Sequence, residues 1–182
     1  SFGNLIRATA EINESIFPSR QLWRDYRTDS GGAGEYRGGC GSLYRKQVLV
    51  PATVYTYVVG RDYPMPGIAG GMDGAPNRLL TKVRKRGEGC EVGILSERVE
   101  HEAGECYEYY YGGGGGWGDP LRRPPARVLD DVLDEYVSVE AAARDYGVVL
   151  RGSLEKLTLR IDHPATEVRR NEIAQTRKED VA

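Results

Sequence analysis

Hydrophobic and polar positions follow a strand-like pattern over the first two thirds of the chain. Residues 22–27 (LWRDYR) interleave apolar and charged side chains at period two, as in a half-buried strand. Other stretches are rich in β-branched and aromatic residues, which favour a pleated surface. They predict strands at residues 42–50, 53–59, 79–84, 91–95, 97–101 and 105–111. Their even spacing, with glycine-containing turns, indicates a mainly antiparallel sheet.

The last third of the chain has the longer period of helices. Apolar positions within residues 128–133 share one helical face after the proline pair at 124–125, which can open a helix. Ser138 predicts the N-cap of a short helix that ends at Gly147. Residues 157–161 predict a strand, and Asp162 predicts the cap of a polar terminal helix to about residue 178.

These periods predict an α+β fold, a mainly antiparallel β-domain with a helical C-terminal third. We expect a β-rich glycine-loop region, residues 1–122, and a helical region, residues 123–182, packed as one domain. Residues 4–17 alternate weakly and predict extended chain or a short strand. Residues 61–78 contain Pro and Gly without a period and predict a long irregular loop, a kind usually functional or interface-forming. Pro51 cannot donate to a ladder and predicts a bulge, an edge or a turn.

Composition excludes several classes of function. The chain has 182 residues and a formal net charge of −2, with no basic stripe, so we expect no nucleic-acid partner. It has no apolar run of the ~20 residues that span a bilayer, so we expect no membrane segment. Three cysteines are too few and odd in number for a disulfide framework, which favours the cytoplasm.

Two glycine-rich blocks carry most of the information. They are residues 29–41 (DSGGAGEYRGGCG) and residues 112–120 (GGGGGWGDP). Neither has the Lys-Ser or Lys-Thr pair of a P-loop, and neither opens a helix after a strand as the dinucleotide-binding fingerprint does. Glycine this dense marks positive φ angles or close approach of another group to the backbone. We therefore interpret both blocks as structural elements of a specific fold.

The first block contains the best candidates for a functional loop. Arg37 offers a planar fork for a carboxylate, either of a substrate or of Asp29. Asp29 and Ser30 can also bind neighbouring backbone N–H groups in a turn. A clamped structural turn and direct substrate contact both remain open. The candidate substrate or scaffold residues are Asp29, Ser30, Gly31, Gly32, Gly34 and Arg37.

The second block and the strand before it supply two further candidates. Five consecutive glycines lose much entropy on ordering, so a partner or another part of the fold must hold them. This candidate glycine loop comprises Gly113, Gly114, Gly115, Gly116 and Asp119. Tyr107, Tyr109 and Tyr111 alternate and would share one face of a strand, as an interface patch or as an aromatic wall beside a substrate channel.

No complete catalytic set is evident, so the catalytic residues stay unknown. The two histidines, His101 and His163, lie in no Ser/His/Asp order and no metal-binding motif. Cys90, His101 and Cys106 are close in sequence but lack the short paired spacings of a zinc site. Buried, unligated cysteine is the favoured interpretation, and we predict neither a metal nor a cofactor in this chain.

Three ordered motifs resemble the C-terminal portion of the hydantoinase B/oxoprolinase family. They are residues 29–41, residues 113–122 (GGGGWGDPLR) and residues 138–150 (SVEAAARDYGVVL), and the resemblance extends over residues 6–174. Family members are usually far longer. The chain is therefore expected to be either a split subunit or a fragment.

The resemblance implies a subunit of a multi-subunit, ATP-dependent enzyme that is not catalytic alone. The expected reaction is hydrolysis of a cyclic amide of the hydantoin or 5-oxoproline type. One alternative is ketone carboxylation of the acetone or acetophenone type, and a second is a purely structural assembly subunit. The implied partners are a hydantoinase A-like ATP-binding subunit and the remaining B-type subunit, which would hold ATP and a divalent metal.

Overall fold

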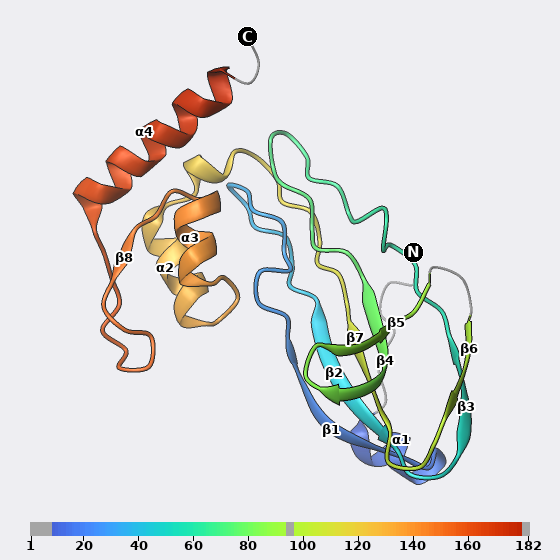
Figure 1. Ribbon diagram of the computed structural model, residues 1–182. Helices are drawn as coiled ribbons and strands as arrows, with labels where there is room; N and C mark the ends of the chain where they lie inside the picture. Colours follow the sequence, from blue (N-terminus) through green and yellow to red (C-terminus); the bar gives the residue numbers. More distant parts are fainter. Residues whose placement is uncertain (1–8, 94–96, 180–182) are drawn as a thin grey trace. The chain divides into compact units, whose positions relative to one another are not determined.

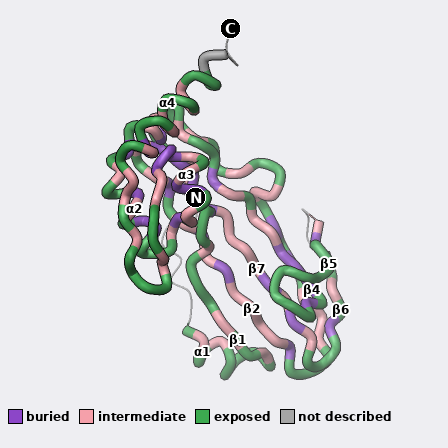
Figure 2. Tube along the Cα trace, turned by 60° about the vertical axis from the view of Figure 1, so that its left-hand side comes forward, coloured by how far each residue is buried: buried purple, intermediate pink, exposed green. Residues whose placement is uncertain are grey.

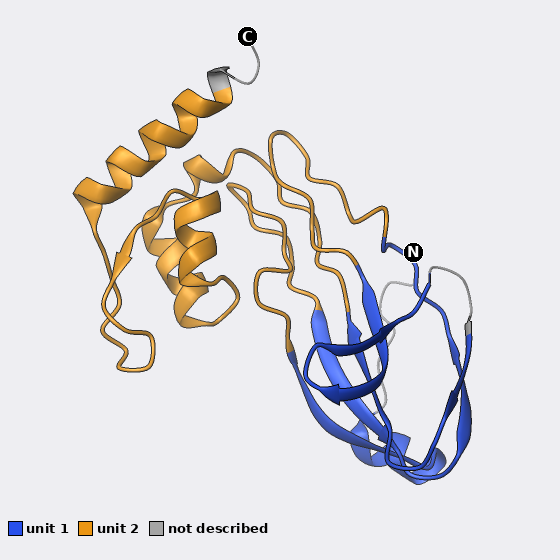
Figure 3. Ribbon diagram, viewed as in Figure 1, with its two compact units in different colours: residues 1–25, 42–61, 77–110 blue, residues 26–41, 62–76, 111–182 orange. Residues whose placement is uncertain are grey.

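The computed structural model describes residues 9–93 and 97–179, which divide into two compact units (Figure 3). Unit 1 comprises residues 1–25, 42–61 and 77–110, and unit 2 comprises residues 26–41, 62–76 and 111–182. The glycine-rich segments therefore group with the helices. The sequence instead predicted two regions that meet at residue 122, packed as one domain, and that division stays a prediction.

Unit 1 is built on a five-stranded sheet of order β1-β2-β7-β4-β5 (Figure 1). Strands β3 and β6 form a separate antiparallel pair, and the helix α1 precedes β1. The ladders β2–β7, β4–β7 and β4–β5 are antiparallel. The elements are α1 (Ala10–Ile16), β1 (Ser19–Tyr26), β2 (Ser42–Val48), β3 (Ala52–Thr56), β4 (Arg78–Lys85), β5 (Glu88–Glu91), β6 (Glu97–His101) and β7 (Cys106–Tyr110).

The two faces of the large sheet carry different apolar clusters. On one face, Tyr107 and Tyr109 of β7 pack against the buried Val58, Leu79 and Val92. On the other face lies a cluster that contains Leu80, Val83, Cys106 and Tyr110. Because successive side chains of β7 point to opposite faces, this strand contributes to both clusters. Figure 2 shows buried positions along β7 and β4.

Unit 2 combines the glycine-rich segments with a small helical core. Its elements are the 3-10 helix η1 (Pro120–Arg122), α2 (Pro125–Leu133), α3 (Val139–Asp145), the hairpin β8 (Leu150–Arg151) and β9 (Arg160–Ile161), and α4 (His163–Glu179). Val128 and Val132 of α2 are fully buried, as their one-sided spacing predicts. They pack with α3 and with Tyr146 and Val148 in one cluster.

The α+β prediction is confirmed, including the mainly antiparallel sheet and the helical C-terminal third. The predicted caps also form: the Ser138 side chain accepts from Ala141 N–H at 3.0 Å, and Asp162 accepts from Ala165 N–H at 3.1 Å. Pro51 lies in the bend between β2 and β3. No helix within the described residues is long and apolar enough to cross a membrane.

Three local predictions need correction. Residues 10–16 form a helix rather than extended chain, because the Thr9 side chain caps Ile12 N–H and Glu11 occupies the first turn. The strand predicted at residues 91–95 lies earlier in the chain, because β5 spans Glu88–Glu91 and shares only Glu91 with the prediction; residues 94–96 lie outside the described part. The strand predicted at residues 157–161 shrinks to β9, because Leu157 has φ 51° in a turn.

Candidate functional site

Two residues at the start of the first glycine block, Asp29 and Ser30, hold it in place. Ser30 is fully buried; its hydroxyl donates to the carbonyl of Arg27 and accepts from Gly41 N–H at 2.8 Å. Asp29 accepts from the backbone N–H of Ser138 at 2.7 Å, at the start of α3. These contacts anchor the block on its own ends and on the helical core.

Three glycine-rich segments of unit 2 pack backbone against backbone: residues 29–41, 65–75 and 113–118. Hydrogen bonds connect each segment to the others. They include Gly32 N–H to Gly114 O at 2.8 Å, Met72 N–H to Ala33 O at 2.7 Å and Gly116 N–H to Met72 O at 2.9 Å. The segments thus hold one another, and the pentaglycine run is ordered without side chains.

The glycines in these segments are required by close approach. A Cβ on Gly32 would lie 2.1 Å from Met72 O, and one on Gly38 would lie 2.0 Å from Gly114 O. Similar clashes with backbone atoms, at 1.9 to 2.7 Å, would occur at Gly31, Gly34, Gly113, Gly115 and Gly116. Gly114 and Gly39 are exceptions, since their nearest atoms lie at 3.4 Å and beyond 4 Å.

Arg37 pairs with Asp131 of α2, so the pairing with Asp29 suggested by the sequence is wrong. The Nε of Arg37 lies 3.3 Å from Oδ1 of Asp131. Arg123 binds the other oxygen of the same carboxylate, with Nε at 3.0 Å and a terminal nitrogen at 2.8 Å. Asp29 is not the partner because it is already engaged at the start of α3 by Ser138 N–H.

Both arginines also bind backbone carbonyls of the glycine segments. Arg37 donates to Gly38 O at 2.7 Å, and Arg123 donates to Glu35 O at 3.0 Å. Each guanidinium therefore joins the first glycine block to the carboxylate of Asp131. We call Arg37, Arg123 and Asp131 the arginine–aspartate cluster. Sequence reasoning missed Asp131, although its position three residues after Val128 and one before Val132 places it on the buried helix face.

The surroundings of this cluster are largely dehydrated. The guanidinium of Arg37 lies 5.0 Å from the ring centre of Tyr136 and 3.1 Å from Cys40 Sγ. Burial raises the pKa of Tyr146, whose hydroxyl has no hydrogen-bond partner among the described residues. Burial also lowers the pKa of Arg170, which donates to the carbonyl of Arg123 at 2.7 Å. Low polarity strengthens the ion pairs and makes the loss of any partner costly.

Asp119 ends the second glycine block through local and distant contacts. Its carboxylate accepts from Leu121 N–H at 2.9 Å. The same oxygen lies 2.9 Å from a guanidinium nitrogen of Arg177 on α4. Asp119 therefore links the end of the glycine segment to the terminal helix.

The three tyrosines do not share one strand face as predicted. Tyr107 and Tyr109 lie on β7 beside Tyr44, whose ring centre is 6.1 Å from that of Tyr109. Tyr111 lies beyond the end of β7, because the strand stops at Tyr110. Tyr107 lines a surface cavity of about 340 Å³ with Phe17 and Tyr55. The role of the tyrosines as a substrate wall stays a prediction.

His101 is a buried histidine that sequence reasoning did not single out as functional. Neither ring nitrogen has a hydrogen-bond partner among the described residues, although Glu105 Oε2 lies 3.3 Å from Nδ1. Burial, opposed by Glu105, lowers the pKa of His101. Within the described residues, no group of three or more His, Cys, Asp or Glu side chains is arranged to hold a metal ion. Cys40, Cys90 and Cys106 are free.

Fold and site together define an α+β protein whose interlocked glycine segments are fastened by a buried ionic cluster. The family model described as hydantoinase B/oxoprolinase matches residues 2–120. The chain therefore belongs to the hydantoinase B/oxoprolinase family, as the three motifs indicate.

Relatives of this chain are much longer proteins. It is 36% identical over 176 residues to the beta chain of the caprolactamase of Pseudomonas jessenii, covering 93% of this chain and 29% of that protein. It is 29% identical to the B component of a putative D-/L-hydantoinase of Pseudomonas sp. (strain NS671), covering 85% of this chain and 26% of that one. The chain thus spans less than a third of the length of these relatives.

Two solved structures resemble the fold. The crystal structure of the ATP-dependent caprolactamase from Pseudomonas jessenii superposes with a TM-score of 0.76 at 32% identity, over 93% of this chain and 29% of that one. A nucleotide-free acetone carboxylase gives a TM-score of 0.81 at 24% identity, over 94% and 27%. The second likeness concerns the fold alone.

Proposed function

We propose that this chain forms part of the B-type component of an ATP-dependent, multi-subunit enzyme that hydrolyses a cyclic amide. The observation that carries the proposal is the 36% identity to a caprolactamase subunit, which extends over 93% of this chain. The similarity to the B component of a putative hydantoinase points to the same class of substrate. Hydantoins, 5-oxoproline and lactams share the ring amide that such an enzyme opens.

Ketone carboxylation is the second candidate. The chain is 27% identical to the acetone carboxylase alpha subunit of Xanthobacter autotrophicus over 94% of its length. The lower identity ranks this chemistry behind amide hydrolysis. A third alternative is a subunit without any chemical step, whose only task is to complete the fold of a larger protein.

We propose an assembly role for the glycine segments and the arginine–aspartate cluster. Their polar groups bind one another, with Arg37 and Arg123 both turned to Asp131. We propose as partners a hydantoinase A-like ATP-binding subunit and the remaining B-type polypeptide, which would hold ATP and a divalent metal. The interface should exceed about 2,000 Å² of buried surface, as in obligate assemblies. The sparse, free cysteines favour the cytoplasm.

Reconstitution tests the proposed reaction. The chain would be co-expressed with the polypeptides encoded beside it, and the purified complex assayed for substrate-dependent ATP consumption. Caprolactam, hydantoin and 5-oxoproline form one arm, and acetone with bicarbonate forms the other. Turnover in the first arm is the expected result. Turnover only in the second arm would establish the carboxylase alternative, and full activity of a complex lacking this chain would refute a catalytic contribution.

A pair of arginine variants tests the assembly role. Arg37→Ala should lower the yield of assembled complex more than the turnover of each assembled complex, because the cluster lies within the scaffold. Arg37→Lys should also weaken assembly, since lysine keeps the charge but not the planar fork. Arg122→Ala, at an exposed position in the same unit, is the matched control. Normal assembly of Arg37→Ala with activity abolished would make Arg37 a substrate contact.

A further inference from the structure

A cationic surface pocket is lined entirely by residues of unit 1. Its volume is about 720 Å³, within the range of small-molecule sites. Its apolar lining comes from Leu22, Val83 and Cys106. The cationic side chains Arg45 of β2 and Lys82 and Arg84 of β4 line the same pocket, so charged groups converge on an apolar surface.

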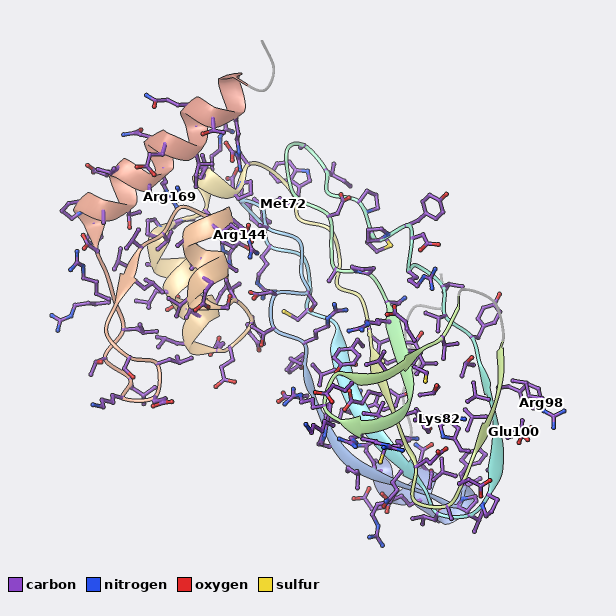
Figure 4. The ribbon with its side chains drawn as sticks, in the orientation of Figure 1. Met72, Lys82, Arg98, Glu100, Arg144 and Arg169 are labelled. Atoms are coloured by element: carbon purple, nitrogen blue, oxygen red, sulfur yellow. The ribbon has the colours of Figure 1, made fainter. Side chains whose placement is uncertain are left out.

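A β-bulge places Lys82 at this pocket. Between the paired positions Leu80↔Glu108 and Val83↔Cys106, β4 has two residues, whereas β7 has only Tyr107. Lys82 occupies this insertion with φ 52°, in the left-handed region that lysine rarely adopts. Figure 4 shows Lys82 on β4. Bulges re-aim side chains and are frequent beside functional sites, where such strain is retained.

The pocket carries more positive charge than its own residues neutralise. Within the described part of the chain, the side chains of Lys82 and Arg84 form no ion pair. Arg45 is engaged within the protein: one terminal nitrogen donates to Val83 O and to Arg84 O, each at 3.1 Å, and the other lies 3.7 Å from the buried Glu108. The one carboxylate in the lining, Glu105, already accepts from Glu102 N–H at 3.1 Å. The exposed charges of Lys82 and Arg84 therefore have no ion-pair partner among the described residues, and the pocket favours an anionic acceptor from outside the protein.

A neighbouring cavity lacks this excess of charge. It has a volume of about 400 Å³, and its lining balances the cations Lys82 and Arg98 with the carboxylates Glu91 and Glu100. Arg98 and Glu100 lie 2.7 Å apart. Both side chains point outward from β6 in Figure 4. The excess of cations over carboxylates therefore distinguishes the larger pocket.

We propose that the larger pocket binds a small molecule through a compact oxyanion, a phosphate or carboxylate group, held by the side chains of Lys82 and Arg84. Phosphate and carboxylate oxygens accept charge-assisted hydrogen bonds from guanidinium and ammonium groups. The apolar residues Leu22 and Val83 would contact the rest of the ligand. This site is independent of the proposed reaction and contains none of the residues in the arginine–aspartate cluster.

Titration of the 182-residue chain tests the proposal. Inorganic phosphate and malonate would be added separately, up to about 20 mM, and backbone amide signals followed by NMR. Ionic strength is held constant because exposed charges are screened by salt. We expect saturable shifts at the amides of residues 45, 82–84 and 104–105. Saturation by phosphate or by malonate identifies the preferred oxyanion, and saturation by neither overturns the proposal.

Two variants of β4 separate a built site from general surface charge. Lys82→Asn removes the charge but accepts the left-handed backbone, so it should weaken binding about tenfold or more while raising the unfolding temperature. Lys85→Asn removes an exposed charge from the same strand that is not part of the pocket lining, and it should change the affinity less than about twofold. Equal losses in both variants, or wild-type affinity in Lys82→Asn, would overturn the site.

Discussion

Gly113→Ala should destabilise unit 2 strongly, because this glycine lies against backbone rather than side chains. A Cβ at this position would lie 1.9 Å from the carbonyl oxygen of Ser30. That oxygen accepts from Ala75 N–H at 2.8 Å, and Gly113 donates to Ala75 O at 3.3 Å, so a shift would break hydrogen bonds. Overpacking costs about 1–3 kcal/mol, and each lost hydrogen bond adds about 1 kcal/mol, which gives a loss of about 3–5 kcal/mol.

Gly114→Ala is the matched control, one residue along the same segment. Its new Cβ would meet its nearest atom, the nitrogen of Gly39, at 3.4 Å, which is ordinary contact. Alanine also restricts the unfolded chain, so this variant should be neutral or up to about 1 kcal/mol more stable.

Thermal unfolding monitored by near-UV circular dichroism measures the difference between the two variants. For a chain of this size, each kcal/mol shifts the midpoint by about 2–4 °C, so Gly113→Ala should unfold about 6–20 °C below the wild type. Midpoints of the two variants within about 2 °C of each other would refute the backbone-packing argument.

Three further predictions concern stability. Asp131→Asn should lower the free energy of unfolding by about 3–5 kcal/mol, because two guanidinium groups lose their carboxylate partner. Arg37→Ala should lower it by only about 1–3 kcal/mol, because Asp131 keeps its other arginine. The reverse order in urea unfolding would contradict the cluster geometry. Ser138→Ala should cost about 1 kcal/mol through loss of the N-cap, and an unchanged urea midpoint would show that the cap is dispensable. Burial lowers the pKa of His101 from 6.5, so the unfolded chain binds the proton at a higher pH than the folded chain does. The stability that the neutral His101 contributes is therefore complete above about pH 6.5, and it is lost as the pH falls toward the lowered pKa. His101→Phe should flatten this part of the urea-midpoint profile and His163→Gln, at an exposed site, should not; equal profiles for wild type and His101→Phe would exclude this origin.

Local signals in the sequence predicted the elements well where one physical rule dominated. Ser138 and Asp162 cap helices as their side chains predict, because a cap needs only the following backbone N–H groups. The strand at residues 97–101 has the predicted bounds. The prediction failed at residues 10–16, where a weak alternation competed with the Thr9 cap and the cap prevailed.

The candidate site was only partly accessible to the sequence. Glycine density predicted close backbone approach, which the structure bears out at Gly32 and Gly38. The carboxylate that binds Arg37 lies 94 residues away, on a helix that the sequence could place but not orient against the loop. Asp29, the nearer carboxylate, was the wrong partner because α3 already uses it.

The order of residues alone encodes the family, the succession of strands and helices, and the glycine blocks where backbone segments approach closely. These features follow from motifs, periods and caps that act over a few residues. The tertiary structure decides which segments hold the pentaglycine run and which carboxylate joins Arg37 to Arg123. It also places Lys82 in a bulge beside two other cations. Those outcomes depend on register and packing between segments distant in the chain, which no local pattern encodes.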